Sequence, residues 1–374
     1  MTSVASASES SANVAGSTVK NPHPDWIGEA LGTTITAMDI QPMGPSRGFQ
    51  STTWKLHLTC DPVGSAPASV VLKSETSNKD FNALSRLHNA FGREVGVYTH
   101  CVPRLKNHQP TIFACHGGDI SWLLMEDLTH LRAGDQVIGL SHADVRDSVR
   151  RMAALHAEFW LDPHLEQQSW LPLHSFWFQK PKPELLEDFF TTYAIRFGAR
   201  VAQLFRAVLE QGEAIDAALH ERPWTLVHGD LRADNLLFDG TAEDPTAIIL
   251  DWSWACRSLG AIDLAFLLGG SAPVAQRQGR LEDLLLTWHG ELLSRGVRDY
   301  PLAEARRDLQ LASLRCITAG VAMYGFLQDP DTTIRTALFM DQAIQRHAAL
   351  AEELQAWEAL PDPSGFAQGQ PLRA

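Results

Sequence analysis

The stretch LVHGDLRADNLLF (226–238) contains an apolar strand, a His-Gly-Asp turn and a second apolar strand within thirteen positions. Asn235 follows Asp230 by five residues, so a short loop between two strands presents a carboxylate and an amide. A further apolar run, AIILD (247–251), ends in Asp251. The polar turn before it allows this run to form a hairpin with the strand that starts at Asn235.

This hairpin predicts a metal site. Pairing Leu236 with Leu250 sets Asn235 opposite Asp251, and opposed residues in an antiparallel pair have Cβ atoms about 4.5–5.5 Å apart. An amide oxygen and a carboxylate at that separation suit one Mg²⁺ ion, which keeps phosphate oxygens and water as its other ligands. Asp230, on the loop before the hairpin, can then accept a proton from an incoming hydroxyl. The competing interpretation is that these acids and the amide only cap turns or end a strand.

The same motifs carry a family resemblance. HGDLRADN (228–235) and ILDWSWA (249–255) resemble the Brenner-type signature of the aminoglycoside phosphotransferase and choline kinase-like superfamily. The most similar branch is the ecdysteroid kinase-like, or CHK-type, group of phosphotransferases. The resemblance extends over roughly residues 40–330. It implies an α+β, two-lobed protein-kinase-like fold with a small β-rich N-terminal lobe and a larger α-rich C-terminal lobe.

The resemblance also implies roles for single residues. Asp230 would be the catalytic base, and Asn235 and Asp251 would be the Mg²⁺ ligands. The sequence departs from the pattern at Arg232, where many aminoglycoside enzymes have His, and at Trp252, where protein kinases have Phe-Gly. These departures argue against a specific aminoglycoside substrate and leave the kinase chemistry intact.

The N-terminal part of the chain reads as strands around one helical segment. TTITAMDIQP (33–42), TTWKLHLTC (52–60) and SVVLKSE (69–75) are rich in β-branched residues, which predicts three antiparallel strands. Residues 81–102 have helical spacing. TIFACHGGDISWLLMEDL (111–128) then offers two further strands around a Gly-Gly turn.

The pattern becomes mainly helical after residue 130, which places a domain boundary near 126–131. We expect a nucleotide-binding lobe over 25–128, with a hinge at its end, and a catalytic and acceptor-binding lobe over 129–358. The segments 1–24 and 359–374 are rich in Ser and Ala, or in Pro, Gly and Gln, and predict disordered tails. Ligands prefer clefts between lobes.

Helix signals are clearest in the second lobe. Ser141 is a suitable N-cap, with Asp144 three residues later. Further helical stretches cover roughly 184–220, 280–296 and 302–358.

A kinase-like small lobe also needs a cation for the nucleotide phosphates and an acid that holds this cation. The predicted third strand supplies Lys73, and the helical segment supplies Glu94, 21 residues later. Singly, each fits an exposed strand lysine or an exposed helix carboxylate equally well. Together, in the expected order, they predict an ion pair that binds ATP phosphates.

Two other segments are candidates for nucleotide contacts. The loop GPSRGFQSTT (44–53) could cover the phosphates through backbone N–H groups near Gly48 and Ser51, although an ordinary hairpin turn fits it nearly as well. By the resemblance, WLLMEDL is a strand with the hinge, and adenine would pair with backbone groups from Glu126 to Leu128. The choice between ATP and GTP is left to the backbone geometry of this hinge.

The acceptor is expected to be a small-molecule alcohol. Eight residues separate Asp251 from the predicted helix GAIDLAFLL (260–268), which is too few for a peptide-docking activation segment. Residues 159–197 hold ten aromatic residues, which favours an apolar, ring-bearing or quaternary-ammonium alcohol, unless these rings pack into the core instead. His156 and Asp263 are expected to be structural.

Composition excludes several other classes of function. The formal charge of −13 disfavours nucleic acid and anionic membranes as partners, because both require a basic face. The five cysteines are widely spaced without CxxC pairs, which argues against a disulfide framework and a thiolate zinc site. Without an apolar run of about 18–20 residues or a signal-peptide core, a cytoplasmic location is expected.

The sequence thus predicts a small-molecule kinase that transfers a phosphoryl group in line from Mg²⁺·ATP to a hydroxyl, with an Asp base. The alternatives are an antibiotic kinase, acting on an aminoglycoside or a macrolide, and a choline-like kinase. A non-catalytic nucleotide-binding regulator belongs to a different class. The presence of all five groups, Lys73, Glu94, Asp230, Asn235 and Asp251, counts against that regulator.

Overall fold

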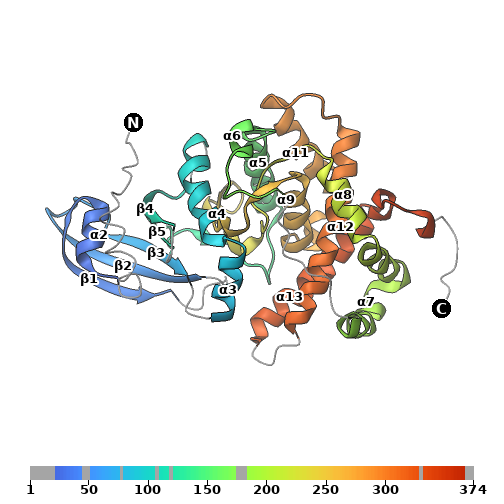
Figure 1. Ribbon diagram of the computed structural model, residues 1–374, viewed down its shortest axis with the longest axis horizontal. Helices are drawn as coiled ribbons and strands as arrows, with labels where there is room; N and C mark the ends of the chain where they lie inside the picture. The colour runs from blue at the N-terminus through green and yellow to red at the C-terminus, as the bar shows by residue number, and fades with distance from the viewer. Residues whose placement is uncertain are drawn as a thin grey trace. The chain divides into compact units, whose positions relative to one another are not determined.

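The computed structural model describes residues 22–43, 51–75, 79–105, 109–117, 121–173, 183–327 and 332–366. Contacts between Cα atoms divide the chain into two compact units, Met1–Leu131 (unit 1) and Arg132–Ala374 (unit 2). Figure 1 shows the elements of both units.

Unit 1 is built on a five-stranded antiparallel sheet with the strand order β1-β2-β3-β5-β4. This arrangement confirms the predicted succession of three strands, a helical segment and two strands. The elements are α2 (Pro24–Leu31), β1 (Thr34–Pro42), β2 (Ser51–Asp61), β3 (Ser69–Glu75), α3 (Lys79–Leu87), α4 (Ala90–Gly96), the turns η1 (Val97–Cys101) and η2 (Val102–Arg104), β4 (Ile112–His116) and β5 (Trp122–Glu126).

The helix α2 covers one face of this sheet (Figure 1) and was not predicted. Its side chains Trp26 and Ile27 pack in one cluster with Leu56 of β2 and Leu72 of β3. The helix has ordinary start and stop signals, because a proline begins it and Gly32 ends it in the left-handed conformation at φ 69°. Eight residues are too few to show a clear apolar period in the sequence.

Unit 2 is mainly helical, as predicted, with two small sheets, β10-β7 and β6-β8-β9. Its elements are β6 (Arg132–Ala133), α5 (His142–Glu158), α6 (Pro163–Glu166), α7 (Pro183–Glu210), α8 (Gly212–His220), β7 (Thr225–Val227), η3 (Ala233–Asn235), β8 (Leu236–Gly240), β9 (Pro245–Ile249), η4 (Trp252–Trp254), β10 (Cys256–Ser258), α9 (Ala261–Phe266), η5 (Leu267–Ser271), α10 (Val274–Arg277), α11 (Leu281–Ser294), α12 (Leu302–Leu327), α13 (Ile334–Glu353), η6 (Ala356–Ala359) and η7 (Ser364–Phe366).

The start of α5 matches the sequence prediction. The Ser141 hydroxyl accepts a hydrogen bond from the backbone N–H of Asp144, and the Asp144 carboxylate accepts one from the Ser141 backbone, which forms a capping box. The stripe of Val145, Val149 and Met152 is buried, as its helical spacing predicts.

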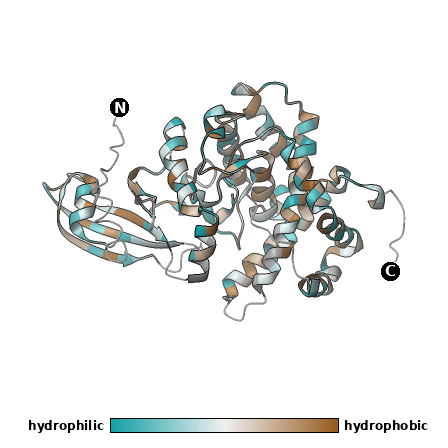
Figure 2. Ribbon diagram, viewed as in Figure 1, coloured by the Kyte–Doolittle hydropathy of each residue, from teal (hydrophilic) through white to brown (hydrophobic). Residues whose placement is uncertain are grey.

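Two helices, α12 and α13, occupy the stretch 302–358 that was predicted as helical, and they lie side by side (Figure 1). Figure 2 shows apolar residues among the central helices of this unit. All six residues of α9 are buried there. α9 therefore supplies a fixed platform for the neighbouring 228–235 loop.

The C-terminal segment differs from the disordered tail predicted from residue 359. Leu360 is buried, the side chain of Gln211 pairs with the backbone of Asp362, and the rings of Trp357 and Phe366 stack. One apolar side chain and one stacked ring hold these residues against the unit, although they form no periodic pattern. Residues 367–374 lie outside the described residues.

His347 of α13 gives unit 2 a defined acid sensitivity. Its ring is buried beside Phe266, and its Nδ1 lies where a side chain on Gly269 would collide with it. Burial, together with repulsion from Arg277 and Arg346, lowers the pKa of His347 to about 3.

The unfolded chain therefore binds more protons than the folded chain between pH 3 and pH 6.5. Stability from this group is complete above pH 6.5 and is lost as the pH falls. Between pH 6.5 and pH 4.5, we expect the unfolding free energy of His347→Gln to fall by about 2 kcal/mol less than that of the parent. Urea titrations at several pH values would measure this, and parallel curves for the two proteins would contradict it.

In the part of the chain that the structure describes, none of the helices combines the length and the apolar character that crossing a membrane requires.

Candidate active site

An ion pair joins Lys73 and Glu94 in unit 1. The Lys73 Nζ donates to Glu94 Oε1 at 2.9 Å and to Oε2 at 2.8 Å. Glu94, on α4, is 1% exposed and Lys73, on β3, is 9% exposed, so the pair is largely removed from water. The Lys73 ammonium also lies over the ring of Phe91, 5.9 Å from its centroid. The carboxylate therefore holds the ammonium in one place, which is the arrangement that the sequence predicts.

The other nucleotide-binding candidates of unit 1 are only partly described. Gly48 lies outside the described residues, and Ser51 is the first residue of β2, opposite Glu75 of β3. Glu126 ends β5, and its carboxylate accepts a hydrogen bond from the Thr111 backbone. Leu128 is buried. The backbone from Glu126 to Leu128 therefore starts on a sheet strand and is anchored by a buried side chain.

Asp127, to which no sequence motif pointed, fastens the predicted hinge segment to the sheet. Its carboxylate accepts hydrogen bonds from Lys55 Nζ, from the Ser69 hydroxyl, and from the backbone and hydroxyl of Thr129. Burial would raise the pKa of Asp127, but these hydrogen bonds outweigh burial and lower the pKa below its ordinary value. The segment around Asp127 is therefore held by a charged group that stays ionised.

In unit 2, Asp263 of α9 holds the start of the 228–235 loop through hydrogen bonds to its backbone. The two carboxylate oxygens accept hydrogen bonds from the backbone N–H groups of His228, at 2.7 Å, and Gly229, at 2.9 Å. Gly229 has φ 80°, and a Cβ there would lie 2.4 Å from the Trp254 carbonyl, so only glycine fits. His156 Nε2 also contacts Asp263 at 3.2 Å. Both His156 and Asp263 are thus structural, as expected.

His228 connects this loop to the segment that ends in Asp251. Its Nδ1 accepts a hydrogen bond from the Asp230 backbone at 3.2 Å, so its Nε2 carries the proton and donates to the Leu250 carbonyl at 2.8 Å. Its ring also lies against Trp252, with 4.8 Å between centroids. The backbones next to Asp230 and Asp251 are therefore held by one side chain.

Asp230 is oriented by two neighbours on the same loop. Its Oδ2 accepts a hydrogen bond from Arg232 Nε and another from Asn235 Nδ2, each at 3.1 Å. Asn235 Nδ2 also donates to the Asp230 carbonyl at 2.8 Å. Among the residues that the structure describes, none donates to Oδ1 of Asp230. This oxygen is therefore the one available to accept a proton from a ligand.

Arg232 is surrounded by the carboxylates of Asp230, Asp234 and Asp251. Its guanidinium bonds Asp230 on one side and Asp234 on the other, and stacks over the ring of Phe339 of α13. Burial by itself would lower the pKa of Arg232, but the surrounding carboxylates of Asp230, Asp234 and Asp251 raise it. In the sequence Arg232 is only a departure from a motif, whereas in the structure it is the shared partner of Asp230 and Asp234.

The predicted register of the hairpin is wrong by one residue. Leu236 pairs with Ile249, not with Leu250, and the Leu250 N–H donates to the Asn235 carbonyl at 2.9 Å. The reason is local, because Asn235 ends the 3₁₀ turn η3 and is not a strand residue. Asp251 then leaves the hairpin in the left-handed conformation, at φ 65° and ψ 68°. Asn235 and Asp251 are therefore not opposed across the strands.

The donor set nevertheless fits Mg²⁺. The amide nitrogen of Asn235 donates to Asp230, which leaves the amide oxygen of Asn235 for a cation. The carboxylate of Asp251 lies close enough to Arg232 to raise the pKa of the guanidinium. Mg²⁺ is commonly held by one or two protein oxygens together with substrate phosphates. The described residues contain no group of three or more His, Cys, Asp or Glu side chains suited to a metal. A cation held by Asn235 and Asp251 would therefore take its other ligands from phosphate oxygens and water.

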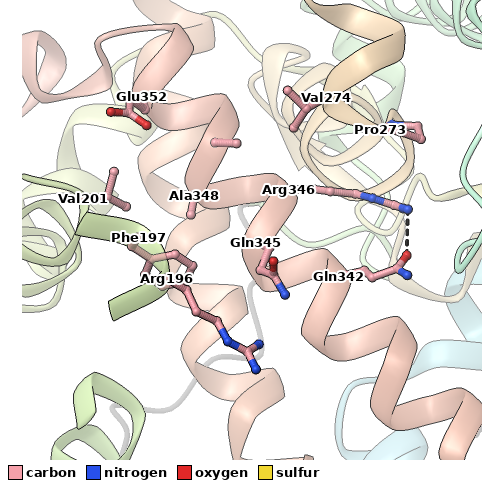
Figure 3. Close-up of a pocket in the computed structure, with 11 residues that line it drawn as sticks. Arg196, Phe197, Val201, Pro273, Val274, Gln342, Gln345, Arg346, Ala348 and Glu352 are labelled. Carbon is pink, nitrogen blue, oxygen red and sulfur yellow. Dashed lines mark hydrogen bonds between the residues drawn. The ribbon is translucent and has the colours of Figure 1, made fainter. Parts of the chain in front are cut away.

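A pocket of about 350 Å³ lies in unit 2 between α7, α13 and the start of α10 (Figure 3). Arg196 and Phe197 of α7 line it together with Gln342 and Arg346 of α13. Most described rings of the aromatic segment do not line this pocket. Those that pack in the core are Phe159, Phe189, Phe190 and Tyr193. Most of the described aromatic rings of residues 159–197 therefore pack into the core and do not form an aromatic acceptor pocket.

The fold and these side chains define the class of protein-kinase-like small-molecule phosphotransferases. Within this class, the chain belongs to the ecdysteroid kinase-like family, whose model matches residues 46–296. This confirms the resemblance stated from the sequence. No curated protein sequence matches the chain.

Solved structures confirm the two-lobed fold. A microcompartment-associated aminopropanol kinase has a TM-score of 0.52 at 15% identity, over 89% of this chain and 98% of that one. The ethanolamine kinase of Plasmodium vivax has a TM-score of 0.50 at 11% identity, over 94% and 95%. The aminoglycoside phosphotransferase APH(2″)-IIIa, in complex with GDP and kanamycin, has a TM-score of 0.50 at 15% identity, over 86% and 94%.

Proposed function

We propose that this protein transfers the terminal phosphoryl group of Mg²⁺·ATP to a hydroxyl of a small molecule. The observation that carries the proposal is the geometry at Asp230, whose Oδ2 is held by Arg232 and Asn235 while none of the described residues donates a hydrogen bond to its Oδ1. The structural neighbours include an aminopropanol kinase, an ethanolamine kinase and an aminoglycoside phosphotransferase bound to kanamycin, which agrees with a small-molecule acceptor.

In this proposal, Asp230 binds the acceptor hydroxyl through Oδ1 and takes its proton as the oxygen attacks phosphorus. The fixed Oδ2 matters because a positioned base gains most of its effect from orientation. The buried Arg232 guanidinium donates a hydrogen bond to the Asp230 carboxylate and places positive charge beside the reacting group.

The remaining groups bind the nucleotide. Lys73, held by Glu94, neutralises phosphate oxygens, and the backbone from Glu126 to Leu128 binds the purine. Asn235 and Asp251 would hold Mg²⁺, which would neutralise charge on the phosphate chain.

The test is release of ADP or GDP from the Mg²⁺ nucleotide across a panel of alcohols, with Asp230→Asn as the blank. The panel contains sterols, choline, ethanolamine, aminopropanol, aminoglycosides and macrolides. Release that depends on one alcohol and disappears in the blank supports the kinase and names its acceptor class. Tight nucleotide binding without release for any alcohol would favour the non-catalytic regulator instead.

A prediction concerns the ion pair of unit 1. Lys73→Met should lower kcat/KM for ATP about 100-fold, because the phosphates lose a preorganised cation. It should also lower the unfolding free energy by about 3 kcal/mol, because the Glu94 carboxylate stays buried without its partner. Steady-state kinetics and denaturant titrations measure the two effects.

The double variant Lys73→Met/Glu94→Leu separates the two effects. It should recover most of the stability, because no charge remains buried, but none of the activity. Arg86→Met is the matched control, since Arg86 forms a partly exposed ion pair with Glu75 in the same unit. Recovery of activity in the double variant would show that Lys73 serves stability and not the nucleotide.

A further inference from the structure

Gln136, on the segment between β6 and α5, is 2% exposed. Its side chain forms hydrogen bonds with the 228–235 loop and with η5. Its Oε1 accepts hydrogen bonds from the Ala233 N–H at 2.9 Å and from the Ser271 hydroxyl at 2.8 Å. Its Nε2 donates to the Gly270 carbonyl at 2.7 Å, and its backbone N–H donates to Asp234 Oδ1 at 3.0 Å. One buried side chain thus joins the loop to η5.

Ser271, at the end of η5, is fully buried and contacts the same backbone group. Its hydroxyl oxygen accepts from the Ala233 N–H at 2.8 Å and donates to Gln136 Oε1. The Ala233 N–H therefore has two acceptors. Ala233 lies three residues after Asp230 and two before Asn235, so its position sets where both of these side chains stand.

The helix α13 holds the backbone of Gln136 through Arg346. Arg346 donates to the carbonyls of Gln136 at 2.8 Å, Val137 at 2.9 Å and Gly270 at 3.1 Å. The same Arg346 also bonds Gln342, as the dashed line in Figure 3 shows. Arg346, which donates all of these hydrogen bonds, lies beyond the matched family segment, which ends at residue 296.

We infer that Gln136 and Ser271 are positioning residues, which fix the Ala233 backbone and thereby set the places of Asp230 and Asn235 for phosphoryl transfer. The inference rests on the proposed function for its kinetic part. A buried amide without partners would cost stability, and here its partners belong to the loop and its support. Small displacements of reacting groups lower rates strongly, so losing these bonds should affect kcat more than nucleotide binding.

The first experiment needs no activity. Hydrogen exchange of residues 226–238 in the free protein should become about 10-fold faster in Gln136→Met and in Ser271→Ala, because each removes one acceptor from the Ala233 N–H. Methionine keeps the volume of Gln136, so a faster exchange reports the lost hydrogen bond. Unchanged exchange in both variants would overturn the inference, whether or not the protein is a kinase.

The second experiment uses the alcohol that stimulates ADP release in the parent. We expect kcat to fall about 10- to 100-fold in Gln136→Met and less in Ser271→Ala, with KM for ATP within about twofold of the parent. The double variant should lose less than the product of the single losses, because both act on the same N–H. If exchange rises while kcat stays at the parent value, the two side chains serve stability alone. If no alcohol stimulates the parent, the proposed function fails and the exchange experiment alone decides whether Gln136 holds the loop.

Gln310 of α12 is the matched control. It is also a buried glutamine, 8% exposed, and its Nε2 donates to the Leu354 carbonyl and to Glu358. Gln310→Met should lower the melting temperature without changing kcat or exchange in 226–238. If kcat falls equally in this control, removing the hydrogen bonds of any buried polar side chain in unit 2 slows the reaction. That result would overturn a specific role for Gln136.

Discussion

Asp230→Asn should lower kcat about 1,000-fold, while the dissociation constant of Mg²⁺·ATP stays within about twofold of the parent value. An amide has the shape of the carboxylate and can still accept hydrogen bonds from Arg232 and Asn235, so the loop should keep its geometry. It cannot take a proton from an alcohol near neutral pH. Single-turnover phosphoryl transfer and calorimetric titration of the nucleotide measure the two quantities.

Asp234→Asn is the control for this prediction. Asp234 bonds the same Arg232 guanidinium through Oδ2, so its substitution removes the same charge from the same partner. Its Oδ1 accepts hydrogen bonds from Gln136 and Arg335, neither of which donates to Asp230. We expect a loss of about 10-fold or less, through displacement of the loop. Equal losses in the two variants would assign the effect to the charge around Arg232, and Asp230 would not be the base.

Asp251→Asn should weaken binding of Mg²⁺·ATP about 100-fold and abolish the difference in affinity with and without Mg²⁺. Asparagine tolerates the left-handed backbone found at this position, so the turn after β9 should persist. The carboxylate is the only charged oxygen in the pair that would bind the cation, and an amide attracts Mg²⁺ much more weakly. Titrations of ATP with Mg²⁺ and with EDTA measure the difference.

Asp239→Asn tests whether any acid of the hairpin has this effect. Asp239 is exposed on β8, and among the described residues its carboxylate bonds only the neighbouring Gly240 N–H, so its variant should bind Mg²⁺·ATP like the parent. Normal Mg²⁺-dependent binding by Asp251→Asn would mean that Asp251 is not a metal ligand. The predicted metal site would then be wrong in its residues as well as in its register.

The class of fold was accessible from local patterns. Alternating and β-branched stretches gave the five strands of unit 1 in their order, and helical spacing gave α5 with its Ser141 capping box. These features depend on neighbours within a few residues, which the sequence displays directly. The pairing of Lys73 with Glu94 was also predictable, because a strand and the following helix fix the order of the two charges.

Contacts made by one side chain with distant backbone were not predictable. Gln136 and Ala233 are 97 residues apart, and Arg346 and Gln136 are 210 residues apart. Neither glutamine nor arginine at these positions forms a motif with its partners. The one-residue error in the hairpin had a similar origin, because a 3₁₀ turn before β8 shifts the register without any change in the apolar pattern.

The sequence by itself determined which groups are the candidates for the proposed reaction and their order along the chain, because the motif around Asp230, Asn235 and Asp251 is local. Only the tertiary structure decided how these groups are held. The Asp263 carboxylate and the Gln136 amide accept hydrogen bonds from backbone N–H groups that the 228–235 loop cannot pair itself, and the His228 ring ties this loop to the Leu250 carbonyl. A short loop leaves its N–H groups unpaired, and the side chains that pair them can come from any part of the chain that folding brings near.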